Sequence, residues 1–348
     1  MRHLDKFIIP GKVNMCIGGG FGSTGKGAIS AAIAMDNDIT VSCSTTSPNA
    51  GHTFYWDDRK YVTHLIPASA IINKRNQIYF SAESVIDEDL LLKEIDEFNI
   101  DPARIAIHPR AMVIRQEDKN QEHQPGGIEV IASTQSGTGA VRAAKILRQP
   151  VTVEQHPRLK EFARVLPLMR WMDDFDAGIY VETGQGLGLD INHGLAYPYC
   201  TSRSVHPGQI LAELGVLPQY MGNLMLCTRT FPIRVGNPTR DGKEVGYSGP
   251  FYDDSTEIQF KDLGVEDELT TVTKRVRRVS TFSMEQYEYE IDFLRPTHVF
   301  LNFINYYENG KFPIPQFTKK YKPTHVGYGP YPDQIRPWEN GIIHRVQK

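Results

Sequence analysis

The chain has 348 residues, of which 40% are hydrophobic and 23% are charged, and its formal net charge is -3. This composition is typical of a globular protein, and the length suffices for one large α/β domain or two modest ones. The slight negative charge argues against a broad nucleic-acid surface, and no stretch approaches the roughly 20 apolar residues of a membrane span. We therefore expect neither a nucleic-acid nor a membrane partner.

The four cysteines (Cys16, Cys43, Cys200 and Cys227) lie far apart and form no C-x-x-C pair. This pattern predicts neither a zinc site nor a disulfide framework, and it suits a reducing compartment. The first residues, Met-Arg-His-Leu-Asp-Lys, lead into a polar, glycine-rich loop without a long apolar segment. We therefore expect no signal peptide and a cytoplasmic location.

The N-terminal region predicts a strand, a tight loop, a helix and a second strand. Residues 13–17 form a short apolar run that ends in three glycines, residues 28–35 are rich in alanine, and residues 39–44 form a second apolar run. This order is the usual start of a parallel α/β sheet.

The same alternation continues along the chain. Predicted helices cover residues 83–98, 157–172, 207–214 and 283–294, and predicted strands cover residues 104–108, 178–182, 224–230 and 298–304. Residues 241–268 read as loops and short strands, and the proline-rich C-terminal tail should cover the surface irregularly. We predict an α/β fold with a mostly parallel central sheet flanked by helices. Because no linker is evident, we expect one domain over residues 1–348.

The loop at residues 20–27 reads Gly-Phe-Gly-Ser-Thr-Gly-Lys-Gly and partly matches two nucleotide-binding motifs. The dinucleotide motif needs an acid at the end of the second strand, and residues 41–44 contain none. A P-loop needs Ser or Thr directly after the lysine, where this chain has Gly27. These gaps disfavour a dehydrogenase and a P-loop kinase. Glycines followed by a helix still indicate phosphate binding, although an incidental glycine-rich turn is the alternative.

A second segment, Pro-Asn-Ala-Gly-His-Thr at residues 48–53, follows the second predicted strand. A lone histidine is more often structural than catalytic. His52, however, lies near a strand end, where the sites of open α/β sheets gather.

Together these segments resemble the adenylosuccinate synthetase family, which carries a G-D-E-G-K-G loop and an N-A-G-H-T segment. Residues 133–139 resemble its G-T-T-G-x-G-x-G loop, residues 234–237 its R-V-G-x, and residues 273–278 its T-G-R-x-R-R loop. Residues 182–202 are similar to its E-G-A-Q-G…L-D-I-D-H-G…Y-P-x-V-T-S run, the most specific match. The matches run in order from residue 18 to about residue 330.

The resemblance implies a ligase in which the 6-oxygen of a purine attacks the terminal phosphate of a nucleoside triphosphate. The amine of aspartate then displaces the 6-phosphoryl group. Positioning and stabilisation of negative charge drive such transfers. The implied catalytic residues are Ser23, His52 and Gln185, with His52 as a donor to the transferred phosphoryl group.

The family match also assigns binding residues. For the donor nucleotide they are Gly22, Ser23, Thr24, Gly25, Lys26, Gly27, His52, Thr53, Asn305, Gly327, Gly329 and Pro330. For the purine nucleotide they are Ser23, Asn49, Ser133, Thr134, Arg148, Gln185, Thr201, Val235 and Gly236. For aspartate they are Thr271, Val272, Thr273, Arg275 and Arg277. Magnesium would contact Gly51 and Ser23. Arg148 matches an arginine that reaches across a dimer, which implies a homodimer.

The phosphate loop departs from the family pattern at Ser23 and Thr24, where the family has Asp and Glu. That Asp is the family's base on the purine N1, and a serine is no effective base at neutral pH without an activator. Ser23 is smaller and uncharged, which leaves room for a 2-amino group. The form resembles the bacteriophage branch that makes 2-aminoadenine DNA precursors, which would place the enzyme in the host cytoplasm.

This branch implies condensation of aspartate with dGMP to give 2-amino-2'-deoxy-N6-succinyladenylate. An ordinary enzyme that uses IMP and a non-catalytic nucleotide-binding protein are the alternatives.

The second departure lies at residues 301–305, which read Leu-Asn-Phe-Ile-Asn where the family has L-T-K-x-D. The family's Asp selects guanine in GTP. Asn305 removes that charge, an amide can pair with adenine, and Phe303 can stack on a base. We therefore predict ATP or dATP as the phosphate donor. The alternative is that Asn305 only weakens the selection of guanine, because loss of an acceptor need not create a new preference.

Overall fold

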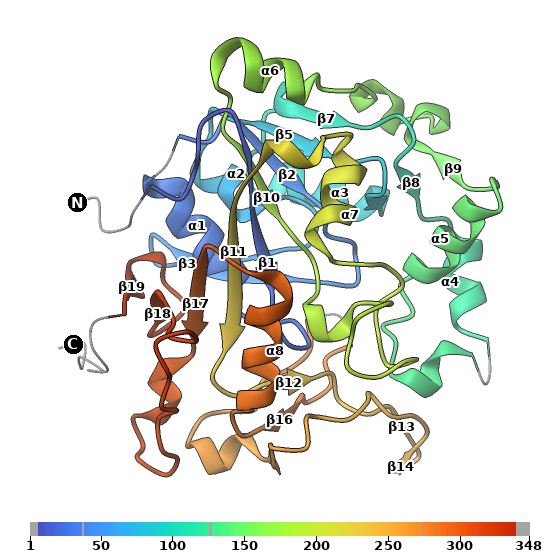
Figure 1. The fold of residues 1–348 in the computed structure, drawn as a ribbon. Coiled ribbons are helices and arrows are strands. Elements are labelled where there is room, and N and C mark those ends of the chain that lie inside the picture. Colours follow the sequence, from blue (N-terminus) through green and yellow to red (C-terminus); the bar gives the residue numbers. More distant parts are fainter. Residues whose placement is uncertain (1–5, 37, 125–126, 272, 339–348) are drawn as a thin grey trace.

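A computed structural model describes residues 6–36, 38–124, 127–271 and 273–338. Its centre is a nine-stranded sheet in the order β19-β18-β17-β11-β1-β10-β2-β5-β7 (Figure 1). The strands are β1 (Val13–Gly18), β2 (Val41–Ser44), β5 (Gln77–Phe80), β7 (Ile105–Ile107), β10 (Ile179–Glu182), β11 (Met221–Arg229), β17 (His298–Asn302), β18 (His325–Gly327) and β19 (Ile335–Pro337). Every neighbouring pair is parallel except β18 and β19, which confirms the predicted mostly parallel sheet.

Helices cover both faces of this sheet. They are α1 (Lys26–Asp36), α2 (Ala68–Ile72), α3 (Glu88–Glu97), α6 (Leu168–Phe175), α7 (Pro207–Leu214) and α8 (Met284–Leu294). The helices α4 (Gln116–Glu122) and α5 (Thr138–Ile146) instead pack against each other, and α5 packs on a smaller sheet through Val141. Side chains alternate along a strand, so β1 points Cys16 to the core that contains α1, α2 and α3, and Met15 and Ile17 to the core that contains α6, α7 and α8. These two cores confirm the predicted helix layers.

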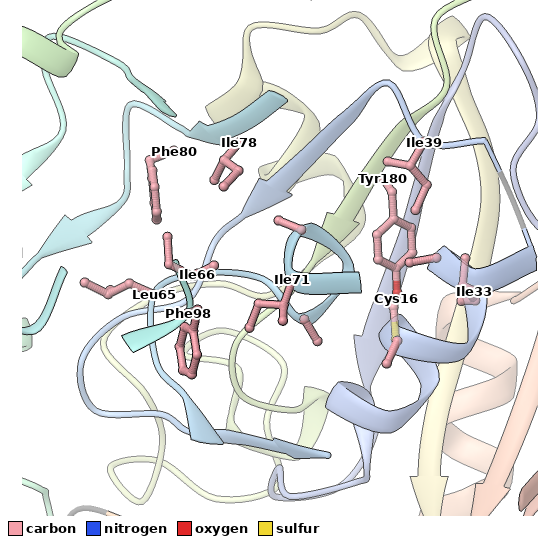
Figure 2. Packing of buried hydrophobic residues seen from close by; sticks show 14 of the residues in the cluster. Cys16, Ile33, Ile39, Leu65, Ile66, Ile71, Ile78, Phe80, Phe98 and Tyr180 are labelled. Atoms are coloured by element: carbon pink, nitrogen blue, oxygen red, sulfur yellow. The ribbon is translucent and has the colours of Figure 1, made fainter. Parts of the chain in front are cut away.

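The core on the α1 side fixes the position of the phosphate loop. Figure 2 shows Ile33 of α1 and Ile71 of α2 packed with Ile78 and Tyr180 of the sheet. Each fully buried aliphatic or aromatic side chain contributes about 1.5–3 kcal/mol. Helix α1 presents mainly small residues to this core, which allows its backbone to lie close to the sheet. The first residue of α1 is Lys26, so this packing places the lysine directly after the glycine loop.

Smaller sheets carry the remaining strands. They are the hairpin β3 (His52–Trp56) and β4 (Arg59–Thr63); β6 (Val85–Ile86), β8 (Met112–Val113) and β9 (Val151–Thr152); β12 (Ile233–Arg234), β15 (Glu257–Ile258) and β16 (Arg278–Ser280); and the pair β13 (Thr239–Arg240) and β14 (Lys243–Glu244). No helix within the described ranges is long and apolar enough to cross a membrane.

The predicted helix over residues 157–172 is wrong for residues 157–167, whereas residues 168–172 are helical. The chain instead makes a short 3-10 turn at Leu159–Phe162, and α6 begins only at Leu168. Pro167 restricts the residue before it to extended conformations, and Ala163 forms a parallel bridge to Ile107 at the end of β7. Local helical composition is overridden here by a proline and by a long-range pairing.

Two other boundaries differ from the prediction. The helix predicted from residue 83 begins at Glu88, because Val85–Ile86 pair with β8 and Asp87 caps the helix through its side chain. The C-terminal tail is not wholly irregular, because β18 and β19 extend the central sheet at its edge. An edge strand tolerates proline, since one of its sides needs no ladder hydrogen bonds.

Candidate active site

The site lies at the carboxyl ends of the central strands, where ligands bind in open α/β sheets. β1 leads into the loop of residues 18–27, here called the phosphate loop. The loops after β2, β10, β11 and β17 bring His52, Gln185, Arg234 and Phe303 to the same edge. Segments far apart in sequence therefore converge because the strands are parallel and adjacent (Figure 1).

The phosphate loop has a compact left-handed backbone. Gly22 and Gly25 have φ values of 85° and 83°, and Ser23 between them has a φ of 52°. Such angles are strained for most side chains but accessible to glycine. A Cβ at Gly186 would collide with the carbonyl oxygens of Gly19 and Gly20, so the loop after β10 packs directly on the phosphate loop.

Lys26 is buried beneath a cavity of about 580 Å³, here called the Lys26 cavity. Its Nζ donates to the carbonyl oxygen of Gln185 at 2.7 Å. Burial lowers the pKa of Lys26, against the nearby Cys16, Cys227 and Glu182. Among the predicted donor and metal residues, the cavity is lined by Ser23, Thr24, Gly25, Lys26, Gly27, Gly51, His52, Thr53, Gly329 and Pro330.

His52 is held by a carboxylate. Its Nδ1 contacts Glu182 Oε1, and Glu182 Oε2 accepts a hydrogen bond from the backbone N–H of Ala68 at 2.9 Å. Glu182 is fully buried at the end of β10, while His52 borders the Lys26 cavity. With Nδ1 engaged, Nε2 is the nitrogen available to a ligand. A carboxylate behind the imidazole fixes the orientation of the ring.

A second cavity of about 450 Å³, here called the Thr201 cavity, gathers most residues assigned to the purine nucleotide. It is lined by Asn49, Ser133, Thr134, Gln185, Thr201 and Val235. Gln185 Nε2 donates to Asn49 Oδ1 at 3.3 Å, which ties the loop after β10 to the segment after β2.

A junction pocket of about 90 Å³ lies between the two cavities. Its lining includes Ser23, Lys26 and His52, which also line the Lys26 cavity, and Asn49 and Gln185, which also line the Thr201 cavity. A group bound in one cavity can therefore meet a group bound in the other at a place lined by Lys26, His52 and Arg277. That arrangement suits the transfer of a negatively charged group.

The predicted aspartate residues separate into two sets. Thr271 and Arg277 line both the Lys26 cavity and the junction pocket. Thr273 and Arg275 line none of the three cavities, and Thr273 instead bonds to Thr270 through their hydroxyls at 2.6 Å. Val272 lies outside the described residues.

Several other predicted residues line none of these cavities, namely Arg148, Gly236, Asn305 and Gly327, while Gly22 lines the junction pocket. Arg148 is exposed just after α5. The Oδ1 of Asn305 is buried without a hydrogen-bond partner among the described residues. The roles assigned to these residues stay predictions.

The predicted site residues do not include Arg234 and Glu122, which shape the Thr201 cavity. Arg234 is buried, its guanidinium lies 3.7 Å from the centre of the Phe21 ring, and burial lowers its pKa to about 9. Glu122 accepts hydrogen bonds from Gly137, Gly139 and Ala140 at the start of α5. The R-V-G match indicated Arg234, but Glu122 has no local signal, since its partners lie at least 15 residues away.

Comparison with known proteins identifies the family. A family model described as adenylosuccinate synthetase matches residues 15–175 and 160–312. The N6-succino-2-amino-2'-deoxyadenylate synthase of Salmonella phage PMBT28 is 36% identical over 319 residues, which cover 85% of this chain and 86% of that protein. The adenylosuccinate synthetase of Thermococcus sibiricus is 27% identical over 314 residues, 87% of each chain.

A solved structure is similar throughout. It is the succinoaminodeoxyadenylate synthetase of cyanophage S-2L, bound to dGMP and to dATP as an energy donor. It has 34% sequence identity and a TM-score of 0.79, and the match covers 94% of this chain and 95% of that one. The convergent loops, the paired cavities and these matches agree, and the chain belongs to the adenylosuccinate synthetase family.

Proposed function

We propose that the protein is a ligase that condenses L-aspartate with dGMP at the purine 6-position, driven by hydrolysis of ATP or dATP. The product is 2-amino-2'-deoxy-N6-succinyladenylate, with (d)ADP and phosphate. The observation that carries this proposal is Ser23 in the junction pocket, where the residues of two nucleotide-sized cavities meet. The chain is 36% identical to the N6-succino-2-amino-2'-deoxyadenylate synthase of Salmonella phage PMBT28 but 27% identical to the adenylosuccinate synthetase of Thermococcus sibiricus. This difference supports dGMP over IMP as the acceptor.

The geometry suggests how the chain would perform the transfer. A purine nucleotide in the Thr201 cavity would present its 6-oxygen through the junction pocket to a triphosphate in the Lys26 cavity. Lys26 and the loop amides would bind the phosphates, and His52, oriented by Glu182, would donate a hydrogen bond to the transferred group. The aspartate amine then displaces the 6-phosphoryl group, and the former 6-oxygen leaves with phosphate.

Ser23 sets the acceptor in this scheme. Among the described residues that line the junction pocket, none is a carboxylate. The neutral hydroxyl of Ser23 can donate or accept a hydrogen bond and takes less space than an aspartate. A guanine, with its 2-amino group, fits this environment without meeting the charge and bulk of a carboxylate.

Magnesium would be shared between the protein and the phosphates. Ser23 and Gly51 both line the Lys26 cavity and the junction pocket. The described residues contain no group of three or more His, Cys, Asp or Glu side chains arranged for a metal. This donor set fits Mg²⁺, which uses few protein ligands when it binds with a nucleotide, and the ion would neutralise phosphate charge.

The donor base would bind beside Phe303 and Pro330 in the Lys26 cavity. In cyanophage S-2L the similar enzyme was solved with dATP, so we propose an adenine donor here. We also propose a homodimer in which Arg148 of one subunit contacts the nucleotide phosphate in its partner. Ile146 and Leu147, which precede it, are 79% and 65% exposed, as expected for side chains that a second subunit covers.

An isotope experiment tests the reaction and its route. Purified protein is incubated with L-aspartate, dATP, Mg²⁺ and dGMP labelled with ¹⁸O at the 6-position. We expect equal amounts of phosphate and succinylated product, with the label in phosphate. Product without labelled phosphate would overturn the phosphoryl route. Turnover of IMP but not dGMP would favour an ordinary synthetase, and binding without product would favour a non-catalytic protein.

A further inference from the structure

Arg229, the last residue of β11, contacts three separate segments of the site although it is only 2% exposed. Its Nη1 donates to the carbonyl oxygen of Ser23 at 3.1 Å. Its Nη2 donates to Glu268 Oε1 at 2.8 Å, with a second bond from Nη1 to Oε2 at 3.3 Å. Its guanidinium lies 4.0 Å from the centre of the Phe303 ring.

All three contacted residues line the Lys26 cavity, whereas Arg229 itself does not. Ser23 belongs to the phosphate loop, and Phe303 borders the space proposed for the donor base. A guanidinium is planar and rigid, so it can hold a carboxylate, a carbonyl oxygen and an aromatic face in one fixed arrangement. Arg229 therefore acts on any ligand in this cavity through its neighbours.

Glu268 extends the connection to the proposed aspartate site. Its carbonyl oxygen accepts the backbone N–H of Arg277 at 2.9 Å, and Leu269 and Val276 form an antiparallel bridge beside that bond. Tyr306 donates its hydroxyl to Glu268 Oε1 at 2.9 Å. Burial alone would raise the pKa of Glu268, but the charge and hydrogen bonds of Arg229 keep it below the ordinary value.

We infer that Arg229 is a positioning residue that couples the donor-nucleotide site to Arg277 of the aspartate site. This inference rests on the proposed function. A nucleotide that fixes Ser23 and Phe303 fixes Arg229, which holds Glu268 and, through its backbone, Arg277. The charges agree, because the buried guanidinium of Arg229 and the half-buried guanidinium of Arg277 both act on one carboxylate, that of Glu268. One positive charge is then left to be balanced by a carboxylate of aspartate.

The test compares Arg229→Lys, Glu268→Gln and the double variant with the wild type. Lysine keeps the charge but loses the planar fork and the ring contact. We expect Arg229→Lys to raise KM for both dATP and aspartate about tenfold, as loss of a charge-assisted bond implies. The double variant should be no worse than Arg229→Lys, since both residues act in one chain of contacts.

Arg203→Lys is the matched control. Arg203 is a buried arginine that donates two bonds to Glu213, at 2.6 and 2.7 Å, and it lines none of the three cavities. It should lower stability without the paired change in KM. The inference is overturned if KM for aspartate is unchanged in Arg229→Lys, or if Arg203→Lys gives the same pattern.

A binding measurement separates this inference from the proposed reaction. If the wild type forms no product, the proposed function fails, and hydrogen–deuterium exchange of residues 268–271 and 273–277 decides the coupling. We expect a non-hydrolysable ATP analogue to slow exchange there in the wild type but not in Arg229→Lys. Equal protection in both proteins, or none in the wild type, would overturn the coupling.

Discussion

Ser23 of the phosphate loop lines both the Lys26 cavity and the junction pocket, and we propose that its neutral side chain sets which acceptor nucleotide binds. It has a positive φ and lines the junction pocket. Replacing Ser23 with Asp restores the carboxylate of the family pattern. We expect kcat/KM for dGMP to fall by about 100-fold and activity with IMP to rise, because a charged carboxylate would crowd the 2-amino group. Steady-state rates with both acceptors measure this, and an unchanged preference would contradict it.

Glu182 orients the imidazole ring of His52 through the contact between its carboxylate and Nδ1. Glu182→Gln keeps the shape but removes the negative charge behind the imidazole. We expect kcat to fall by about 100-fold with little change in KM for dGMP, as for loss of one preorganised donor. The control is Glu94→Gln, which alters a buried carboxylate that contacts His64 and backbone amides away from the cavities. Similar losses of kcat in both variants would indicate a general structural effect.

At the scale of elements, helix α8 supports the phosphate loop through Glu290. Its carboxylate accepts the N–H of Gly20 at 2.5 Å and the Nε2 of Gln286 at 2.8 Å. Burial raises the pKa of Glu290 to about 7, against these bonds and one from Thr228. The folded protein therefore binds a proton more tightly than the unfolded chain does. Protonated Glu290 therefore contributes to the free energy of unfolding. This contribution is fully present below the unfolded pKa of about 4.5 and is lost as the pH rises through 7.

This linkage gives a measurable pH profile. Between about pH 4.5 and 7, the free energy of unfolding should fall by up to about 3 kcal/mol because of Glu290. In Glu290→Gln this component should be absent, so the variant should gain stability relative to the wild type as the pH rises from about 5 to about 8. Urea denaturation at several pH values measures the difference. Parallel profiles of the two proteins would contradict this account.

The sequence predicted those elements whose signal is local. The apolar runs and glycines near residue 18 predicted β1, the phosphate loop and α1, and the turn residues predicted α7 and α8 within about one residue. Strands β18 and β19 were missed because their partners, not their own composition, stabilise them. The part of the helix predicted over residues 157–172 that precedes Pro167 failed for the same reason, since Ala163 pairs with β7.

The candidate site was predictable where motifs are continuous. The family motifs alone pointed to Lys26, His52, Gln185 and Thr201, and all four line the cavities. Glu122 and Arg229 could not be found in this way, because the residues that they bind lie at least 15 residues away in the sequence. The sequence motifs therefore identify residues that line the cavities, whereas the structure is needed to identify the residues that position them.

At the scale of the whole molecule, the single domain over residues 1–348 and the homodimer stay predictions. Complementation tests the dimer. In an equal mixture of subunits that carry Arg148→Ala or His52→Ala, half of the dimers would be mixed, each with one intact site. We expect about a quarter of wild-type activity from the mixture and little from either variant alone. Additive residual activities after subunit exchange would contradict a shared site.

Among the members of its family, this chain is expected to act on a 2-aminopurine deoxynucleotide. The most direct measurement is the ratio of kcat/KM for dGMP to kcat/KM for IMP, at saturating aspartate, dATP and Mg²⁺. We predict a ratio well above one, of about 100 or more, because Ser23 replaces the carboxylate that an IMP enzyme uses. A ratio below one would contradict the account and identify an ordinary adenylosuccinate synthetase.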